Sequence, residues 1–476
     1  MYETVIGVEV HFELATETKL FCSCKNSFGA PVNTCCCPVC SGLPGALPVL
    51  NRRAVEYAVM AGLALGCRIN SPTSFDRKNY FYPDMPNEYQ ISQFYSPVCT
   101  DGELEFLLAD EPKKVRIREI HLEDDAGKLI HTDGGTLIDF NRAGVPLIEV
   151  VTQPDMRSAE ETVAFLETLR LVMSYLGVSD CKMQEGSMRV DVNLSVHKPF
   201  SPLGTRTEMK NLNSFRAVAH AIESESKRQI ALIESGGRVE QETRRFDDVK
   251  GVSTLMRTKE ESEDYRYVPE PNLPPLFLDA ELSDGLKSKI PELAHQRRKR
   301  YVSEYGLSCA DAAVLTEDRF TADFFERTAL LCGSEREAAN RIIGDVLREQ
   351  KESGVPLKKS AITPSKLAHI IKLCGSGVIN RKSSRDVISA AYENDIDIDR
   401  YIEMNGLSVI CDERVISDAV SAVIMENEKA VSDWRSGKKQ VFGNIVGQTM
   451  KRLGGRAEPK TVNKIVIEML KQIIFY

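Results

Sequence analysis

Alternation of apolar and polar residues constrains the fold of this chain more than any other feature of its sequence. Near the N-terminus, residues 8–14 read VEVHFEL, with an apolar residue at every second position. Because the side chains of a β-strand point alternately to its two faces, this segment predicts a half-buried strand. Its polar face carries Glu9, His11 and Glu13. Two carboxylates that flank an imidazole fit either a solvated surface or a place that holds a cation.

The same alternation recurs further along the chain and predicts a sheet with one polar face. Strands are expected at 5–14, 115–122, 136–140, 188–196 and 205–210. On three of the later strands, carboxylates alternate with basic or amide groups: Glu119, His121 and Glu123; Arg189, Asp191 and Asn193; Arg206, Glu208 and Lys210. If these strands adjoin, their carboxylates repel one another unless a cation lies among them. Such ligands suit Mg²⁺, and the basic groups suit phosphate oxygens. An ordinary half-exposed sheet is the alternative.

The chain of 476 residues is too long for one hydrophobic core, and three parts are predicted. A mixed α+β body is expected at 1–292, with a helix at 158–176 that opens with Ser158 and Glu161 and closes at Gly177. The segment 267–278 contains four prolines and reads as a break or rigid connection. An all-helical domain is then expected at 293–410 and a small helical tail at 411–476.

Six of the 13 cysteines crowd into the segment FCSCKNSFGAPVNTCCCPVC. Cys22 and Cys24 form one close pair and, after twelve residues, Cys37 and Cys40 form another. Two such pairs at the ends of a loop can present four thiolates to one tetrahedral zinc ion, so a structural zinc site is predicted at 22–40. Cys35 or Cys36 could replace a neighbour as ligand. A catalytic thiol and an iron–sulfur cluster are the alternatives.

Charge is distributed unevenly along the chain. The net charge is −8, but residues 431–476 contain nine Lys/Arg and three acidic residues. A basic tail on an acidic body predicts binding of a polyanion; a solvated helical surface is the alternative. No segment is long and apolar enough to span a membrane, and the N-terminus lacks a secretory signal, so a cytoplasmic protein is expected. Glycine-rich phosphate loops and nucleophile elbows are absent from the sequence.

Long motifs in this chain closely resemble the family of B subunits of aspartyl/glutamyl-tRNA(Asn/Gln) amidotransferases. The resemblance runs through the whole chain in order and is carried by VIGVEVHFEL, RKNYFYPDMPNEYQIS, IHLEDDAGK, DFNRAGVPLIEVVTQPDMRS, YLGVSDCKMQEGSMRVDVNLSV, EMKNLNSFRAVAHAIE, DYRYVPEPNLPPL and VFGNIVGQTMKRLGGRAEPKTVN.

This resemblance implies a catalytic cradle domain with an antiparallel sheet, related to the glutamine synthetase/guanidino kinase fold, followed by helical and tail domains. It implies a heterotrimer with an amidase subunit and a small third subunit. It also implies that misacylated Glu-tRNA(Gln), or Asp-tRNA(Asn), is converted to the amide form with ATP, Mg²⁺ and ammonia, and that the basic tail binds the tRNA. No amidase-like nucleophile motif occurs in this chain, which agrees with ammonia release by a partner.

By the same resemblance, the expected magnesium ligands are Glu9, His11, Glu208 and either Glu123 or Asp124, with Asp191 as a further candidate. The family often has Glu-Glu-Asp where this chain has Glu-Asp-Asp at 123–125, which leaves those two alternatives open. Phosphate contacts are expected from Lys128, Arg189 and Lys210, and the Tyr80–Tyr82 motif is expected to border the substrate pocket. Two other functions remain as alternatives: a zinc-stapled scaffold that binds tRNA without catalysis, and a metal-dependent ligase for small molecules.

Overall fold

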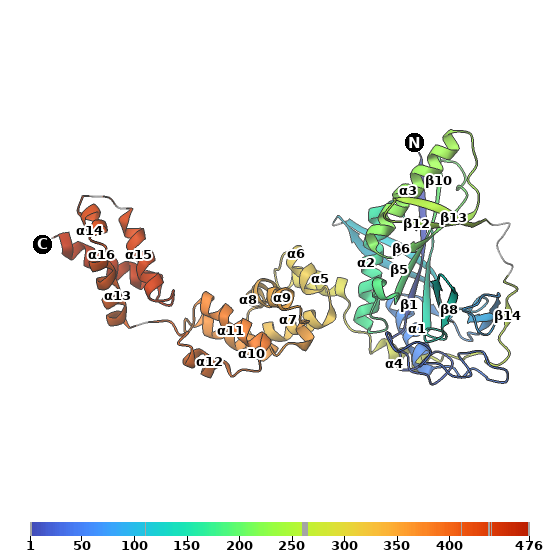
Figure 1. Ribbon diagram of the computed structural model, residues 1–476, viewed down its shortest axis with the longest axis horizontal. Coiled ribbons are helices and arrows are strands. Elements are labelled where there is room, and N and C mark those ends of the chain that lie inside the picture. The colour runs from blue at the N-terminus through green and yellow to red at the C-terminus, as the bar shows by residue number, and fades with distance from the viewer. Residues whose placement is uncertain are drawn as a thin grey trace. The chain divides into compact units, whose positions relative to one another are not determined.

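The computed structural model describes residues 2–109, 111–258, 265–410, 412–436, 438 and 440–474 (Figure 1). It divides into two compact units, Met1–Gln296 and Arg297–Tyr476. The first unit is mixed α/β and the second is helical. No helix among the described residues is long and apolar enough to cross a membrane.

A nine-stranded sheet forms the centre of the first unit, in the order β13-β12-β11-β10-β1-β9-β6-β5-β2. Its strands are β1 (Glu3–Glu13), β2 (Arg68–Ile69), β5 (Cys99–Leu108), β6 (Glu111–Asp124), β9 (Pro146–Thr152), β10 (Met188–His197), β11 (Thr207–Leu212), β12 (Glu242–Asp247) and β13 (Val252–Thr258). Two small sheets accompany it, one of β14 (Val268–Pro269), β3 (Asp76–Asn79) and β4 (Tyr89–Ser92), the other of β7 (Lys128–Thr132) and β8 (Gly135–Asp139).

The large sheet is mixed, which corrects the expectation of an antiparallel one. Strand β11 pairs with β12 in parallel, although the other neighbouring strands described in this sheet are antiparallel. The reason is the connection between them: helix α3 (Phe215–Glu234) carries the chain back along the sheet before β12 begins. A parallel pair needs such a crossover, whereas antiparallel neighbours can be joined by a hairpin.

Three helices cover the apolar face of the sheet. Helices α1 (Arg52–Ala64), α2 (Ala159–Leu176) and α3 pack against β5, β6 and β10, as Figure 1 shows for α2 and α3. The residues that face them alternate along the strands and are fully buried, for example Val10 and Phe12 of β1. The predicted ends of α2 are confirmed, since Ser158 accepts a hydrogen bond from the Glu161 N–H and Gly177 takes the left-handed conformation. Because these three helices lie on the apolar face, they leave the opposite, polar face of the central strands uncovered.

The proline-rich segment 267–278 lies within the first unit. Its residues Val268 and Pro269 pair with β3, and Leu276 forms an isolated bridge with Thr73. The first unit also contains a 3₁₀ turn, Met183–Glu185, and helix α4 (Ala280–Lys287), and α5 (Ala294–Ser303) begins before Arg297.

The second unit contains two separate hydrophobic clusters. One gathers buried side chains between Tyr301 and Ile402, the other between Ile416 and Leu470. The first is built from α5, α6 (Cys309–Leu315), α7 (Arg319–Cys332), α8 (Glu335–Arg341), a π-helical turn (Ile342–Val346), α9 (Leu347–Ser353), a 3₁₀ turn (Leu357–Lys359), α10 (Pro364–Gly375), α11 (Arg381–Glu393) and α12 (Ile398–Met404). The second is built from α13 (Glu413–Glu426), α14 (Glu428–Arg435), α15 (Val441–Arg452) and α16 (Pro459–Ile474). Pro459 opens the last helix, as its fixed φ favours.

A buried carboxylate ties α3 to the sheet. Glu225 is 0% exposed, and its Oε1 accepts hydrogen bonds from Thr207 Oγ1 of β11 at 2.9 Å and from Gln229 Nε2 at 3.0 Å. Arg228 adds two more, from Nε at 2.9 Å and Nη2 at 2.7 Å. Burial would raise the pKa of Glu225, but these donors and the charge of Arg228 hold it below its ordinary value. Glu225 therefore remains ionised beneath β11.

Replacing Glu225 with Ala should lower the free energy of unfolding by about 3 kcal/mol, because it removes the carboxylate that Thr207 and Gln229 donate to and leaves Arg228 with Glu242 as its remaining acidic partner. Glu223→Ala is the matched control: Glu223 lies on the same helix with its side chain 53% exposed. The control should change stability by less than about 0.5 kcal/mol. Urea unfolding followed by circular dichroism measures both, and equal effects of the two substitutions would contradict the role of Glu225.

Candidate active site

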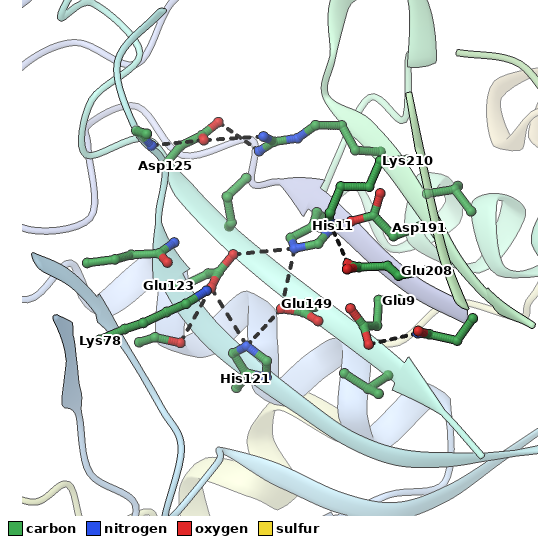
Figure 2. A pocket seen from close by; sticks show the side chains of 18 of the residues that line it. Glu9, His11, Lys78, His121, Glu123, Asp125, Glu149, Asp191, Glu208 and Lys210 are labelled. Carbon is green, nitrogen blue, oxygen red and sulfur yellow. Dashed lines mark hydrogen bonds and ion pairs between the residues drawn. The ribbon is translucent and has the colours of Figure 1, made fainter. Parts of the chain in front are cut away.

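A row of alternating charge crosses the three central strands of the sheet. His11 of β1 pairs across the ladder with Glu149 of β9, and Glu149 pairs with His121 of β6. Glu149 Oε2 lies 3.3 Å from His11 Nε2 and 3.1 Å from His121 Nε2. Glu123 closes the group, with Oε1 3.6 Å from His11 Nε2 (Figure 2). The ligand atoms of His11, Glu123 and Glu149 lie within 4.8 Å of one another, so these residues could hold a metal ion.

Opposite charges stabilise one another within this group. Burial alone would raise the pKa of Glu149, but the charges of His11 and His121 hold it well below its ordinary value. Burial would likewise lower the pKa of His121, but Glu149 and Glu123 raise it to about 10. The pKa of His11 is raised for the same reason. The two imidazoles thus supply positive charge to carboxylates that would otherwise repel.

A second group of carboxylates lies beside the first. Glu9, Asp191 and Glu208, from β1, β10 and β11, also bring their ligand atoms within 4.8 Å of one another. Lys210 Nζ contacts Asp191 Oδ2 at 2.5 Å and Glu208 Oε1 at 2.7 Å. Asn193 Nδ2 donates to Glu9 Oε1 at 2.9 Å. Burial, together with the charges of Glu149 and Glu208, raises the pKa of Glu9. This second group could also hold a cation.

Both groups face one cavity of about 780 Å³. Among the described residues that line it, seven carboxylates are balanced by seven Lys or Arg side chains. Aromatic rings form one wall, where Phe94 stacks on Tyr267 with ring centroids 4.2 Å apart and Lys78 Nζ lies 4.6 Å from the Tyr265 ring centroid. A cavity that offers both acidic and basic groups can bind a cation together with a polyanion.

A guanidinium at the edge of the cavity is held in place by a buried carboxylate. Arg189 Nη2 donates to Asp125 Oδ2 at 2.7 Å and Nη1 to Oδ1 at 3.3 Å. Arg142 also approaches this carboxylate, with its Nε 3.6 Å from Asp125 Oδ2. Arg142 also donates to the carbonyl oxygens of Ala126 and Gly127. Asp125 therefore aligns Arg189 along the cavity wall.

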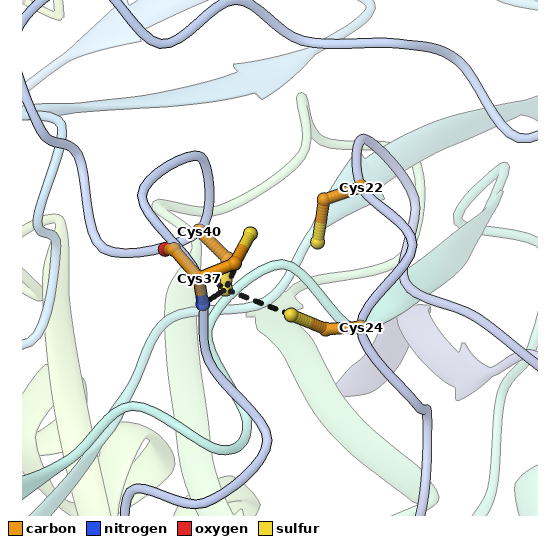
Figure 3. A group of neighbouring side chains, drawn as sticks. All are labelled: Cys22, Cys24, Cys37 and Cys40. Atoms are coloured by element: carbon orange, nitrogen blue, oxygen red, sulfur yellow. Dashed lines mark hydrogen bonds between the residues drawn. The ribbon is translucent and has the colours of Figure 1, made fainter.

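Four cysteines converge outside this cavity, in the loop at 22–40 (Figure 3). The Sγ atoms of Cys22, Cys24, Cys37 and Cys40 lie within 4.8 Å of one another, and Cys40 Sγ is 3.9 Å from both Cys24 Sγ and Cys37 Sγ. Metal–sulfur bonds of about 2.3 Å in a tetrahedron place sulfur atoms roughly 3.8 Å apart. The cluster therefore fits one tetrahedral metal ion.

The two extra thiols of the loop point elsewhere. Cys36 Sγ donates to Asn33 O at 3.2 Å, and Cys35 Sγ lies 3.9 Å from Ser27 Oγ. The structure thus gathers the four cysteines that the spacing predicts, without Cys35 or Cys36. The cysteines among the described residues are free, so this cluster contains no disulfide.

Comparison with known proteins shows which family the sequence matches. The family model described as "GatB/GatE catalytic domain" matches residues 4–284, and the one described as "GatB domain" matches residues 323–470. The chain is 48% identical over 475 residues to the B subunit of the aspartyl/glutamyl-tRNA(Asn/Gln) amidotransferase of Lachnoclostridium phytofermentans, covering 99% of each chain. It is 50% identical to the B subunits from Agathobacter rectalis, over 98% of this chain and 99% of the relative, and from Caldicellulosiruptor saccharolyticus, over 99% and 100%.

The chain belongs to the family of aspartyl/glutamyl-tRNA(Asn/Gln) amidotransferase B subunits. The resemblance seen in the sequence is thereby confirmed. Eight of the residues predicted for the site line the cavity: Glu9, His11, Tyr80, Glu123, Arg189, Asp191, Glu208 and Lys210. Their roles in binding metal or phosphate stay predictions.

Three residues predicted for the site lie away from the described cavity lining. Asp124 points to the other side of β6, where its Oδ1 accepts the Ile91 N–H at 2.9 Å, and burial raises its pKa to about 8. Of the two alternatives, only Glu123 therefore reaches the polar face, because neighbours on a strand face opposite ways. Lys128 is exposed at the start of β7, and the Tyr82 side chain is 54% exposed.

Two central residues of the site were not among those predicted from the sequence. Glu149 occupies the middle of PLIEVVT, a run that is otherwise apolar apart from its last residue. The signal that could have identified Glu149 is a single acidic residue within an apolar segment of strand length, because apolar strands of this kind lie at the centre of a sheet. His121 is on the predicted polar face, but its contact with Glu149 follows only from the pairing of β6 with β9.

The purified chain should contain about one metal ion in the four-cysteine cluster. Cys37→Ser should remove it, because three thiolates leave the tetrahedron incomplete, while Cys36→Ser should retain it. Metal content measured by atomic emission on both variants checks the ligand set. Loss of metal from Cys36→Ser alone would show that the cluster uses different thiols.

Proposed function

We propose that this chain is the catalytic component of a tRNA-dependent amidotransferase. It phosphorylates the side-chain carboxylate of Glu-tRNA(Gln), Asp-tRNA(Asn) or both, and replaces the phosphate with ammonia. The observation that carries the proposal is the pair of ligand groups, His11/Glu123/Glu149 and Glu9/Asp191/Glu208, that face one cavity. Family membership supports the same reaction, because the relatives are named as subunits of this amidotransferase.

The donor sets fit Mg²⁺. Carboxylate oxygens are hard ligands and make up all but one of the donors, and Mg²⁺ commonly takes one or two carboxylates and leaves its remaining positions to water and phosphate. A bound Mg²⁺ ion supplies the positive charge that a triphosphate needs. We assign Glu9, His11, Glu123, Glu149 and Glu208 as ligands, with Asp191 as a further candidate. His11 would release its proton when the ion binds, because only a neutral imidazole is a metal ligand.

The reaction needs activation because a carboxylate is a poor electrophile. The γ-phosphoryl group of ATP is transferred to a carboxylate oxygen of the aminoacyl side chain, which gives an acyl phosphate and ADP. Ammonia then attacks the acyl carbon, phosphate leaves with the electron pair of the broken C–O bond, and ammonia loses a proton to give the amide. The protein positions the reactants and neutralises charge. Arg189, Lys210 and Lys78 are the candidates for holding phosphate oxygens, and Tyr80 borders the substrate.

Partners complete this proposal. An amidase subunit releases ammonia from glutamine, the complex includes a small third subunit, and the reaction takes place in the cytoplasm with the other steps of translation. We propose that the first unit has the fold related to glutamine synthetase and guanidino kinases. A catalytic role is favoured over a tRNA-binding scaffold, because a scaffold has no need for two groups of partly buried carboxylates facing one cavity.

Neighbouring carboxylates provide a sharp test of the site. In the assembled complex, Glu123→Gln should lower ATP consumption and amide formation by about 10³-fold, the effect of losing several kcal/mol of charge stabilisation. Asp124→Asn is the matched control: its amide oxygen can still accept the Ile91 N–H, so activity should remain within a few-fold of the wild type.

The assay follows ATP hydrolysis with misacylated tRNA, uncharged tRNA or free glutamate. Turnover is expected only with misacylated tRNA; activity on free glutamate would support the small-molecule ligase instead. Wild-type turnover in Glu123→Gln would refute the proposed site.

We propose that the metal of the four-cysteine cluster is a structural zinc ion. Zinc prefers four thiolates in a tetrahedron, and a site whose four positions are filled by protein offers none to a substrate. Cys22, Cys24, Cys37 and Cys40 would join two turns of the loop without taking part in the reaction.

We also propose that the basic tail binds the tRNA. Lys451, Lys460 and Lys471 are exposed on α15 and α16. Changing all three to Gln should weaken tRNA binding and reduce the slope of log K against log salt by about 2 to 3, if each contacts a phosphate. A matched triple change of the exposed Lys351, Lys358 and Lys359 to Gln removes the same charge elsewhere in the second unit. Equal effects of the two triple variants in filter binding would assign the affinity to net charge alone.

A further inference from the structure

A lysine is fully buried next to the four-cysteine cluster. Lys19 is 0% exposed, and its Nζ lies 3.4 Å from Cys40 Sγ and 3.2 Å from Phe140 O. Within the described part of the chain, no carboxylate oxygen forms an ion pair with it. Lysine is almost never fully buried without a partner of opposite charge, because moving an ammonium out of water is costly. The contact with Cys40 therefore needs an explanation.

The cluster itself can supply the missing negative charge. Four thiolates around one divalent ion leave an excess of negative charge, which has its own cost of burial. A neighbouring ammonium offsets both costs at once. We propose that Lys19 is the counter-ion of the Cys22/Cys24/Cys37/Cys40 metal site, donating an N–H···S hydrogen bond to Cys40. This inference rests on the assignment of a metal to the cluster.

The backbone around Lys19 is shaped to allow this contact. Gly144 has φ of +81°, and a Cβ atom there would lie 3.3 Å from Cys40 Cβ and 3.6 Å from Lys19 Cδ. A glycine at this position lets the lysine stem and the cysteine approach the chain closely without strain. The second acceptor, Phe140 O, belongs to the same segment and orients the ammonium.

The same segment connects the metal site to the catalytic cavity. Leu20 N donates to Gly144 O at 2.9 Å, and Gly144 N donates to Asp125 O at 2.8 Å. Asp125 in turn holds Arg189 at the cavity wall. Lys19 is therefore a positioning residue: it fixes the metal site against the segment that supports Asp125, and it touches neither substrate nor reacting atoms.

A substitution series separates charge compensation from simple packing. Lys19→Met keeps the volume of the stem and removes the charge, and Lys19→Gln keeps a hydrogen-bond donor without the charge. Lys25→Met is the matched control, since Lys25 lies in the same loop and is exposed. Zinc affinity is measured by competition with a chromogenic chelator on the full chain. Both Lys19 variants should bind zinc about 10- to 100-fold more weakly, as is typical when a partner of a metal ligand is lost. Lys25→Met should match the wild type.

Thermal unfolding gives a readout that packing alone does not produce. With zinc bound, Lys19→Met should lower the melting temperature. After the metal is removed, the same variant should lower the melting temperature by less, because the Cys40 thiolate alone then replaces the negative charge of the four-thiolate site. A residue that only packs would lower the melting temperature equally in both states, which would overturn the proposal.

If wild-type protein takes up no metal at all, the metal assignment itself fails; if it binds zinc and the Lys19 variants bind it equally well, only the counter-ion role fails. Neither result bears on the tRNA-dependent reaction, which Glu123→Gln tests.

Discussion

Electrostatic repulsion between carboxylates on neighbouring strands is the constraint that shapes the centre of this protein. Strands β1, β9 and β6 place Glu149 between His11 and His121, so that each acid has a basic neighbour across the ladder. On β10 and β11, Lys210 likewise places a positive charge between the carboxylates of Asp191 and Glu208. The strand register that produces this arrangement is stabilised by the opposite face of the same strands, which is apolar and buried under helices. A slip of one residue would turn the charged groups into the core.

Much of this architecture can be predicted from the sequence because it depends on local patterns. Period-two alternation locates β1, β6, β10 and β11 to within a few residues, and the cysteine spacing identifies the four thiols that converge. Strand pairing depends on distant segments and has no local signal. Glu149 was therefore not predicted, although it contacts both imidazoles. The choice between Glu123 and Asp124 likewise depends on which of the two side chains faces the cavity at the end of β6. Asp124 faces the other way, where its carboxylate accepts a hydrogen bond from the Ile91 N–H of β4.

The cysteine loop and the charged cavity share one structural support. Asn33 of the loop donates from Nδ2 to Ile138 O, and its Oδ1 accepts a hydrogen bond from the Phe140 N–H. These two hydrogen bonds join the loop to the segment 138–140. Before the loop, Lys19 donates to Phe140 O of that segment and Leu20 donates to Gly144 O just beyond it. The cysteine loop is therefore linked to the cavity lining through the backbone that carries Asp125.

Under the proposed function, the balance of charge in the cavity would link cation binding to phosphate binding. Lys210 is held by Asp191 and Glu208, and Arg189 by Asp125, so these cations are occupied in the chain by itself. Lys210 can turn toward a phosphate only when its carboxylates have another positive partner, because otherwise two acids would remain unpaired at close range. Carboxylates that accept a divalent cation thus free a basic group for the polyanion that accompanies it. The cavity is lined by seven carboxylates and by seven Lys or Arg side chains, with His11 and His121 in addition, and this mixture favours joint binding of a cation and a polyanion over binding of either ion alone.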